Sequence, residues 1–200
     1  MNAAFIERYF AEMRQILDTI SREDIDRVIE ALFAAWREGR TVFLMGNGGS
    51  ASTATHFACD LSKITVCEGR RRLRAVSLCD NPALLSALTN DEGFTHIFSE
   101  QIRSLMQPHD VLIGISVHGG GGSDKAGPWS QNLLRAMQVA KEEFQATVIG
   151  MSGFDGGEFR RVADVCLTVP FPSTPQVESF HLALEHLITF CLKEKIANCP

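Results

Sequence analysis

The sequence predicts an α/β fold in which a doubly wound sheet of five parallel strands is flanked by helices, with two further helices in front of it. Three observations support this prediction. Five short apolar runs recur along the chain, segments with helical spacing separate them, and Gly, Ser, Asp or Pro follows each run. Strands that are apolar throughout and alternate with helices are typical of a parallel sheet covered on both faces. The 200 residues, 45% of them hydrophobic, suffice for one domain of this kind.

Two amphipathic helices are expected before the first strand. Apolar residues recur at helical spacing over residues 3–20, and a second helix begins after Ser21, a natural N-cap, and stops at Gly39. The aromatic side chains of the first helix offer more apolar surface than one sheet edge usually needs. We therefore expect residues 1–38 to be a helical extension that builds a homo-oligomer interface, followed by an α/β core over 41–196.

The apolar runs and the segments between them place the elements of this core. Strands are expected at Thr41–Met45, Leu73–Leu78, Val111–Ser116, Thr147–Ser152 and Val165–Val169. Helices are expected at about Ser52–Ile64, Pro82–Ala87, Thr95–Met106, Ser130–Glu143 and Val177–Glu194. Ligands of such sheets bind beyond the carboxyl ends of the strands, so the residues that follow each strand are the candidates for a site.

A glycine turn, Gly46-Asn-Gly-Gly-Ser50, follows the first strand and leads into a helix. Backbone N–H groups and the positive end of the helix dipole converge at such a turn, which predicts a phosphate site. With Ala51 the turn also satisfies the dinucleotide pattern G-x-G-x-x-G/A, but the acidic residue expected ~20 residues further on is missing. Glu68 precedes the second strand and Asp80 follows it, so we expect no nucleotide cofactor.

Glycine and serine also follow the third and fourth strands, in segments that contain Ser116, His118 and Asp155. Ordinary turns favour the same residue types. Three such loops at equivalent places nevertheless favour a pocket for a polyhydroxylated, phosphorylated small molecule, which many modest hydrogen bonds orient.

Composition excludes several other classes of protein. The net charge of −5 argues against nucleic acid as the main partner. No apolar run approaches the ~20 residues that span a membrane, and the charged amino-terminal segment is no signal peptide. Six cysteines without a C-x-x-C pair are expected to be reduced thiols. We therefore expect a soluble, cytoplasmic protein that binds neither nucleic acid nor a membrane.

Four motifs together resemble the sugar isomerase (SIS) domain family, and within it the phosphoheptose isomerase branch, over nearly the whole chain. They are the glycine turn, His56-Phe-Ala-Cys-Asp60-Leu, the segment Leu88–Phe98 and Val111-Leu-Ile-Gly-Ile-Ser116. The resemblance implies a single SIS domain over 1–200 and a homotetramer with active sites between subunits. It also implies conversion of sedoheptulose 7-phosphate to D-glycero-D-manno-heptose 7-phosphate through an enediol or enediolate, for lipopolysaccharide or capsule synthesis.

The matching motifs also imply which residues bind the sugar phosphate. These are Asn47, Gly48, Gly49, Ser50, Asp91 and Ser116. The loop after the third strand departs from the family, because His118 replaces a serine and a glycine-rich stretch is inserted. The last phosphate serine is then Ser130, which is well placed as an N-cap, or Ser123. The run Gly119–Gly122 is either a lid or a tolerated surface insertion.

Aldose–ketose isomerisation needs a base that moves a proton between adjacent carbons and a group that stabilises the enediolate. His56 and Asp60, four residues apart, share one face of the helix that leaves the glycine turn. The resemblance adds Glu178 and His186 from the last helix. It implies Asp60, His186 and Glu178 as catalytic residues, with Asp60 and His186 as acid and base. It further implies a zinc ion bound by His56, Asp60, Glu178 and His186, which are acceptable zinc ligands.

Helix geometry bears on this ligand set. Eight residues separate Glu178 from His186, roughly 12 Å of helical rise, which is too far for both to reach one ion from one straight segment. Either the last helix begins after Glu178 or the ligands come from different subunits. His96, His109 and His181 are left as structural or surface residues.

A competing hypothesis is a non-catalytic SIS adapter that binds sugar phosphates, as in proteins that bind a replication initiator. An adapter needs only the phosphate pocket and the oligomer surface. The presence of His56, Asp60, Glu178 and His186 together therefore favours the isomerase.

Overall fold

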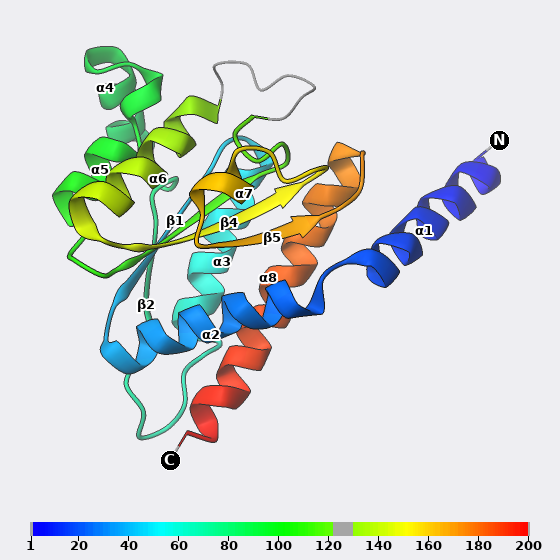
Figure 1. The fold of residues 1–200 in the computed structure, drawn as a ribbon, viewed down its shortest axis with the longest axis horizontal. Helices are drawn as coiled ribbons and strands as arrows, with labels where there is room; N and C mark the ends of the chain where they lie inside the picture. Colours follow the sequence, from blue (N-terminus) through cyan, green and yellow to red (C-terminus); the bar gives the residue numbers. More distant parts are fainter. Residues whose placement is uncertain (1, 122–129, 200) are drawn as a thin grey trace.

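The sheet has the predicted architecture. The computed structural model describes residues 2–121 and 130–199, and it contains a five-stranded parallel sheet with the strand order β2-β1-β3-β4-β5 (Figure 1). The strands are β1 Thr41–Gly46, β2 Arg74–Ser77, β3 Val111–Ser116, β4 Thr147–Gly153 and β5 Val165–Val169. All four pairings between neighbouring strands are parallel. The α/β prediction with two leading helices is confirmed.

Helices connect the strands and flank the sheet. The α-helices are α1 Asn2–Thr19, α2 Arg22–Glu38, α3 Gly49–Lys63, α4 Pro82–Asp91, α5 Ser99–Leu105, α6 Gln131–Phe144, α7 Phe159–Val162 and α8 Thr174–Ala197. A short 3₁₀ helix, η1, spans Phe94–His96. The ends of α2 are as predicted, because the Ser21 hydroxyl accepts a hydrogen bond from the backbone N–H of Asp24 and Gly39 is left-handed with φ 71°.

Several boundaries differ from the sequence prediction. Helix α3 begins at Gly49, three residues before the expected start, because the turn is completed at Gly48 with φ 57°. Gly93, with φ 88°, separates α4 from η1, so the expected helix over 95–106 is a 3₁₀ turn followed by α5. Helix α8 begins at Thr174 because Pro175 suits a first turn. The alternative that this helix begins after Glu178 is therefore wrong.

Two hydrophobic clusters cover the two faces of the sheet. On β1, Val42 and Leu44 belong to the cluster with α2, α3 and α8, whereas Phe43 and Met45 belong to the cluster with α5 and α6. The alternation follows from the two-residue period of a strand. Burial on both faces explains why β1, β3, β4 and β5 are largely apolar. The edge strand β2 is partly exposed and begins with Arg74.

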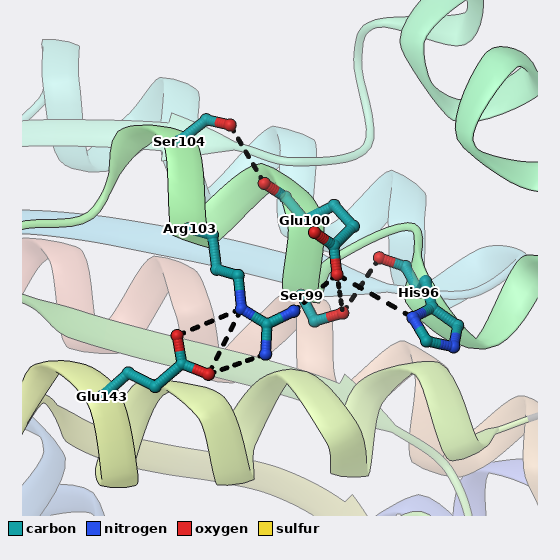
Figure 2. Close-up of polar contacts among 6 residues, drawn as sticks. All are labelled: His96, Ser99, Glu100, Arg103, Ser104 and Glu143. Carbon is teal, nitrogen blue, oxygen red and sulfur yellow. Dashed lines mark hydrogen bonds and ion pairs between the residues drawn. The ribbon is translucent and has the colours of Figure 1, made fainter. Parts of the chain in front are cut away.

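A polar network at the surface joins α5 to α6 (Figure 2). The Arg103 guanidinium donates to both carboxylate oxygens of Glu143 and, at 2.6 Å, to Glu100, while His96 lies 3.8 Å from the same Glu100 oxygen. This fork pairing holds the Arg103 pKa above and the Glu143 pKa below its usual range. The His96 imidazole is thus a surface residue of this network, as expected.

Helix α1 projects away from the sheet (Figure 1). Among its described residues only Ile16 is buried, while Phe5 is 58% and Phe10 53% exposed. Within the described part of the chain, none of the helices is both long and apolar enough to cross a membrane.

Candidate active site at the carboxyl edge of the sheet

The glycine turn is closely packed and holds the start of α3 at the carboxyl edge of the sheet. A Cβ atom on Gly46 would lie 2.5 Å from the Ser50 carbonyl oxygen. Gly48 has φ 57° and ψ −125°, a backbone conformation that favours glycine. The Ser50 side chain is buried in the first turn of α3. Such a helix start is well suited to bind a phosphate.

The register of the sheet brings a second predicted phosphate residue to the same edge. Gly46 pairs with Ile115, so Ser116, the last residue of β3, lies one position beyond the end of β1. Ser116 in turn pairs with Ser152 of β4. The loops that follow β1, β3 and β4 therefore leave the sheet side by side.

A cavity of about 590 Å³ lies beside the glycine turn. The turn forms one wall, and the other wall is largely apolar and comes from α4, η1 and their neighbours, with Leu85, Phe94, Ile97 and Phe98. Cys79 also lines this cavity, and burial raises the pKa of its thiol. A small ligand held at the glycine turn can extend into this space.

Helices α3 and α8 bring two imidazoles and two carboxylates together. The cluster consists of His56 and Asp60 from α3 and Glu185 and His186 from α8, with one ligand atom of each within 4.8 Å of the others. Nε2 of His186 lies 3.5 Å from Asp60 Oδ2 and 3.4 Å from Glu185 Oε1. Nitrogen atoms of His56 lie 3.8 Å and 3.7 Å from the same two carboxylates. We call these four residues the His–carboxylate cluster.

The electrostatics of the His–carboxylate cluster favour a cation. Glu185 is fully buried, and within the described residues neither of its carboxylate oxygens has a hydrogen-bond partner. Burial, and after it the neighbouring Asp60 carboxylate, raise the pKa of Glu185 to about 8. A divalent cation would satisfy these oxygens, and a set of two histidines and two carboxylates fits zinc. The cluster is therefore a candidate metal site.

Glu178 does not belong to this cluster within one chain. Its carboxylate lies against the glycine turn, where a Cβ atom on Gly49 would be 2.7 Å from Glu178 Oε1. Because α8 already includes Glu178, the separation of eight residues from His186 stands. The residue that sequence reasoning missed is Glu185. The distance between Glu178 and His186 was the available signal, but the sequence analysis interpreted it as a later helix start or as ligands from different subunits.

Of the other predicted site residues, Asp91 and Ser130 lie in the part of the chain that the structure describes. Asp91 ends α4, is exposed, and accepts a 2.7 Å hydrogen bond from its neighbour Asn90. Ser130 stands at the N-cap position of α6, but its side chain makes no capping hydrogen bond. Ser123 lies outside the described residues, as does Gly122.

The described part of the inserted loop is packed against the loop after β4. The His118 ring lies 4.5 Å from that of Phe154, measured between centroids. The backbone N–H of Phe159 donates to the Gly119 carbonyl at 2.9 Å, and a Cβ atom on Gly119 would overlap the Gly156 carbonyl. Glycine at position 119 thus permits the two loops to approach closely.

His181 is a structural residue of α8, as expected. It is buried, and one ring nitrogen lies 3.0 Å from the Ser152 carbonyl oxygen. Burial lowers the pKa of the His181 imidazole to about 4, which the Ser152 carbonyl only partly offsets. The ring is therefore neutral at physiological pH.

Comparison with known proteins identifies one matching family and several similar proteins. A family described as the SIS domain matches residues 8–153. The lincomycin biosynthesis protein LmbN of Streptomyces lincolnensis is 42% identical over 163 residues, which cover 80% of this chain and 58% of that protein. The phosphoheptose isomerase of Syntrophotalea carbinolica is 36% identical over 199 residues, which cover 98% of this chain and 96% of that protein.

Solved structures agree with the sequence comparison. The structure of phosphoheptose isomerase GmhA from Neisseria gonorrhoeae is 30% identical, with a TM-score of 0.84 over 97% of this chain and 100% of that one. The two phosphoheptose isomerases match nearly the whole chain, from the leading helices to α8. The chain therefore belongs to the SIS domain family and, within it, to the phosphoheptose isomerase branch.

Proposed function

We propose that this protein is a sugar-phosphate isomerase that converts sedoheptulose 7-phosphate to D-glycero-D-manno-heptose 7-phosphate through an enediolate. One observation carries the proposal: the helix that starts at the glycine turn also carries half of the His–carboxylate cluster. Seven residues separate Gly49 from His56, roughly 10 Å of helical rise, which an extended sugar phosphate can span. The relatives named phosphoheptose isomerases support the choice of substrate.

The phosphate would bind at the glycine turn. Its ligands are the turn residues 47–50 together with Ser116, and Ser130 or Ser123 is a further candidate. Asp91, at the end of α4, would bind a sugar hydroxyl. The glycine turn and the serines hold the terminal phosphate, so that the first carbons of the sugar lie toward the His–carboxylate cluster.

The proton transfer needs groups at the other end of the substrate. Asp60 and His186, 3.5 Å apart, are the proposed acid and base of the metal-free cluster. Zinc held by His56, Asp60, Glu185 and His186 would stabilise the negative charge on the enediolate oxygens. The third proposed catalytic residue, Glu178, has its carboxylate beside Gly49, at the phosphate end of the substrate.

We further propose a homotetramer whose active sites lie between subunits. Exposed apolar side chains lie on α1 and on α8, where they include Leu187 and Phe190, only a few residues from the cluster. The His56 and His186 side chains are themselves 45% and 41% exposed on this face. Packing of a second copy there would remove water from the cluster.

The six cysteines are free thiols, which supports a location in the cytoplasm. There the product would enter the synthesis of lipopolysaccharide or capsule heptose. LmbN is named for lincomycin biosynthesis instead, so the substrate has to be tested directly.

An isomerisation assay with ketose phosphates of five to seven carbons, with and without added zinc, tests the proposal. We expect the highest kcat/KM with sedoheptulose 7-phosphate. Binding of sugar phosphates without turnover of any of them would instead identify a non-catalytic adapter. Preference for another ketose phosphate would retain the isomerase and reject the substrate.

A further inference from the structure

A pair of part-buried hydrogen bonds between amide side chains joins the two segments around the proposed phosphate site. Asn47 lies in the glycine turn and lines the cavity of about 590 Å³. Asn132 lies in the first turn of α6, directly beyond the loop that follows β3, and its side chain is fully buried. A buried amide requires hydrogen-bond partners, and Asn47 of the turn is one partner of Asn132.

The two side chains exchange hydrogen bonds. Nδ2 of Asn47 donates to Oδ1 of Asn132 at 3.0 Å, and Nδ2 of Asn132 donates to Oδ1 of Asn47 at 2.9 Å. Such a pair can be made in two ways, because exchanging oxygen and nitrogen on both sides gives the same two bonds. The pair alone therefore does not determine which end of the Asn47 amide is the donor.

The backbone of α6 determines it. The N–H of Leu133 donates to Oδ1 of Asn132 at 3.0 Å, and a backbone N–H can only donate, so the atom opposite it must be an oxygen. This fixes the orientation of the Asn132 amide and, through the reciprocal bonds, that of Asn47. The orientation of a side chain in the glycine turn is thus set by a helix that follows a different strand.

We propose that Asn132 is a positioning residue: it orients the Asn47 amide for the bound sugar phosphate and couples the glycine turn to α6. The inference rests on the proposed function, which makes Asn47 a substrate ligand. An amide that is already oriented binds without first losing rotational freedom, so affinity rises without any direct contact from Asn132.

A double-mutant cycle tests this role. Binding is measured by calorimetry for the wild type, Asn47→Ala, Asn132→Ala and the double variant, with sedoheptulose 7-phosphate and inorganic phosphate as separate probes. We expect Asn132→Ala to weaken binding about tenfold when Asn47 is present, which corresponds to about one hydrogen bond. When Asn47 is already alanine, the same change should leave binding nearly unaltered.

Gln131→Ala is the matched control, since this exposed neighbour in the same turn should not alter binding. Because alanine at a fully buried position can unfold the chain, Asn132→Leu, which fills a similar volume, is measured in parallel with thermal melting. An equal loss of affinity in both Asn47 backgrounds would show a merely structural role and overturn the proposal. So would unchanged affinity in both.

The two probes separate the inference from the proposed function. A wild-type protein that binds phosphate but neither binds nor isomerises sedoheptulose 7-phosphate refutes the substrate, and the phosphate cycle still decides the role of Asn132. A wild-type protein that binds neither probe overturns both proposals.

Discussion

Single residues decide whether the His–carboxylate cluster holds a metal. Glu185 is buried and, within the described residues, its carboxylate oxygens lack hydrogen-bond partners. We predict that Glu185→Gln lowers zinc affinity by at least about tenfold, since even residues that merely support a ligand are worth 10–100-fold. Competition with a chromophoric chelator measures this affinity directly. In excess chelator the same variant should melt at a higher temperature, because a buried carboxyl group without a partner has been replaced.

Glu178→Gln is the matched control, since it makes the same exchange at the glycine turn. Its zinc affinity should equal that of the wild type, while its turnover should fall. In the reverse pattern, Glu178→Gln loses zinc and Glu185→Gln keeps it. That result would make Glu178 from a neighbouring subunit the fourth ligand.

The buried imidazole of His181 predicts a pH dependence of stability. Its pKa is about 4 in the folded chain, against an ordinary value of 6.5. Between these values the unfolded chain binds more protons, so the free energy of unfolding falls as the pH drops from 6.5 toward 4. The full effect is about 3 kcal/mol. Urea unfolding at several pH values, in chelator to keep the metal state constant, measures it.

His181→Gln isolates this contribution. Glutamine can still donate to the Ser152 carbonyl but does not titrate, so the variant should have a lower stability at pH 7 and a flatter pH dependence below it. Parallel curves for the two proteins would show that other groups cause the acid sensitivity.

At the scale of elements, substitutions at two glycines of the turn between β1 and α3 should affect stability and activity differently. Gly49 has no left-handed backbone, and in a helix alanine is favoured over glycine by up to about 1 kcal/mol. The new methyl group would however meet the Glu178 carboxylate, which is the end of a flexible side chain. We predict that Gly49→Ala keeps or raises the melting temperature while kcat falls. Steady-state kinetics and thermal melting of one preparation test both.

Gly46→Ala gives the contrasting result in the same turn. Its methyl group would meet the backbone of Ser50, which has no room to move, so this variant should lose stability as well as activity. A Gly49→Ala enzyme with unchanged kcat would remove Glu178 from the reaction.

Elements differ in how much of them the sequence predicts. The sequence predicts the ends of all five strands to within one residue. In β1, β3, β4 and β5 the reason is burial on both faces, which produces a nearly continuous apolar run. The 3₁₀ turn over 94–96 and the four-residue α7 were not predicted. Neither has a periodic pattern, since Gly93 imposes the first and packing of Phe159 against the sheet imposes the second.

The role of Glu185 could not be predicted for a related reason. Helix α8 is apolar on several sides, with Leu184 and Ile188 buried and Leu187 and Phe190 exposed. Its pattern therefore does not indicate which side faces α3. His56, Asp60 and His186 were found from motif and resemblance, whereas the fourth member of the cluster required the helix packing itself.

For the whole molecule, the sheet and the two leading helices follow from the sequence, and the proposed homotetramer would give α1 its role. Of its described residues only Ile16 is buried, so α1 contributes little to the stability of one subunit. Fully burying one large apolar side chain is worth about 1.5–3 kcal/mol. The exposed aromatic residues of α1 can therefore contribute this stabilisation only when another copy of the chain buries them.

This predicts that assembly and activity are lost together while the fold of the subunit persists. We expect the double variant Phe5→Ser and Phe10→Ser to shift the protein from tetramer toward smaller species in sedimentation velocity, with Gln15→Ser on the same helix as the unchanged control. Its turnover should fall as well, because the partly exposed His186 would stay in contact with water. The far-ultraviolet circular dichroism should be retained, since Phe5 and Phe10 are 58% and 53% exposed in the single subunit. A fully active monomer would show that one subunit completes the site, and would place all proton transfer within a single chain.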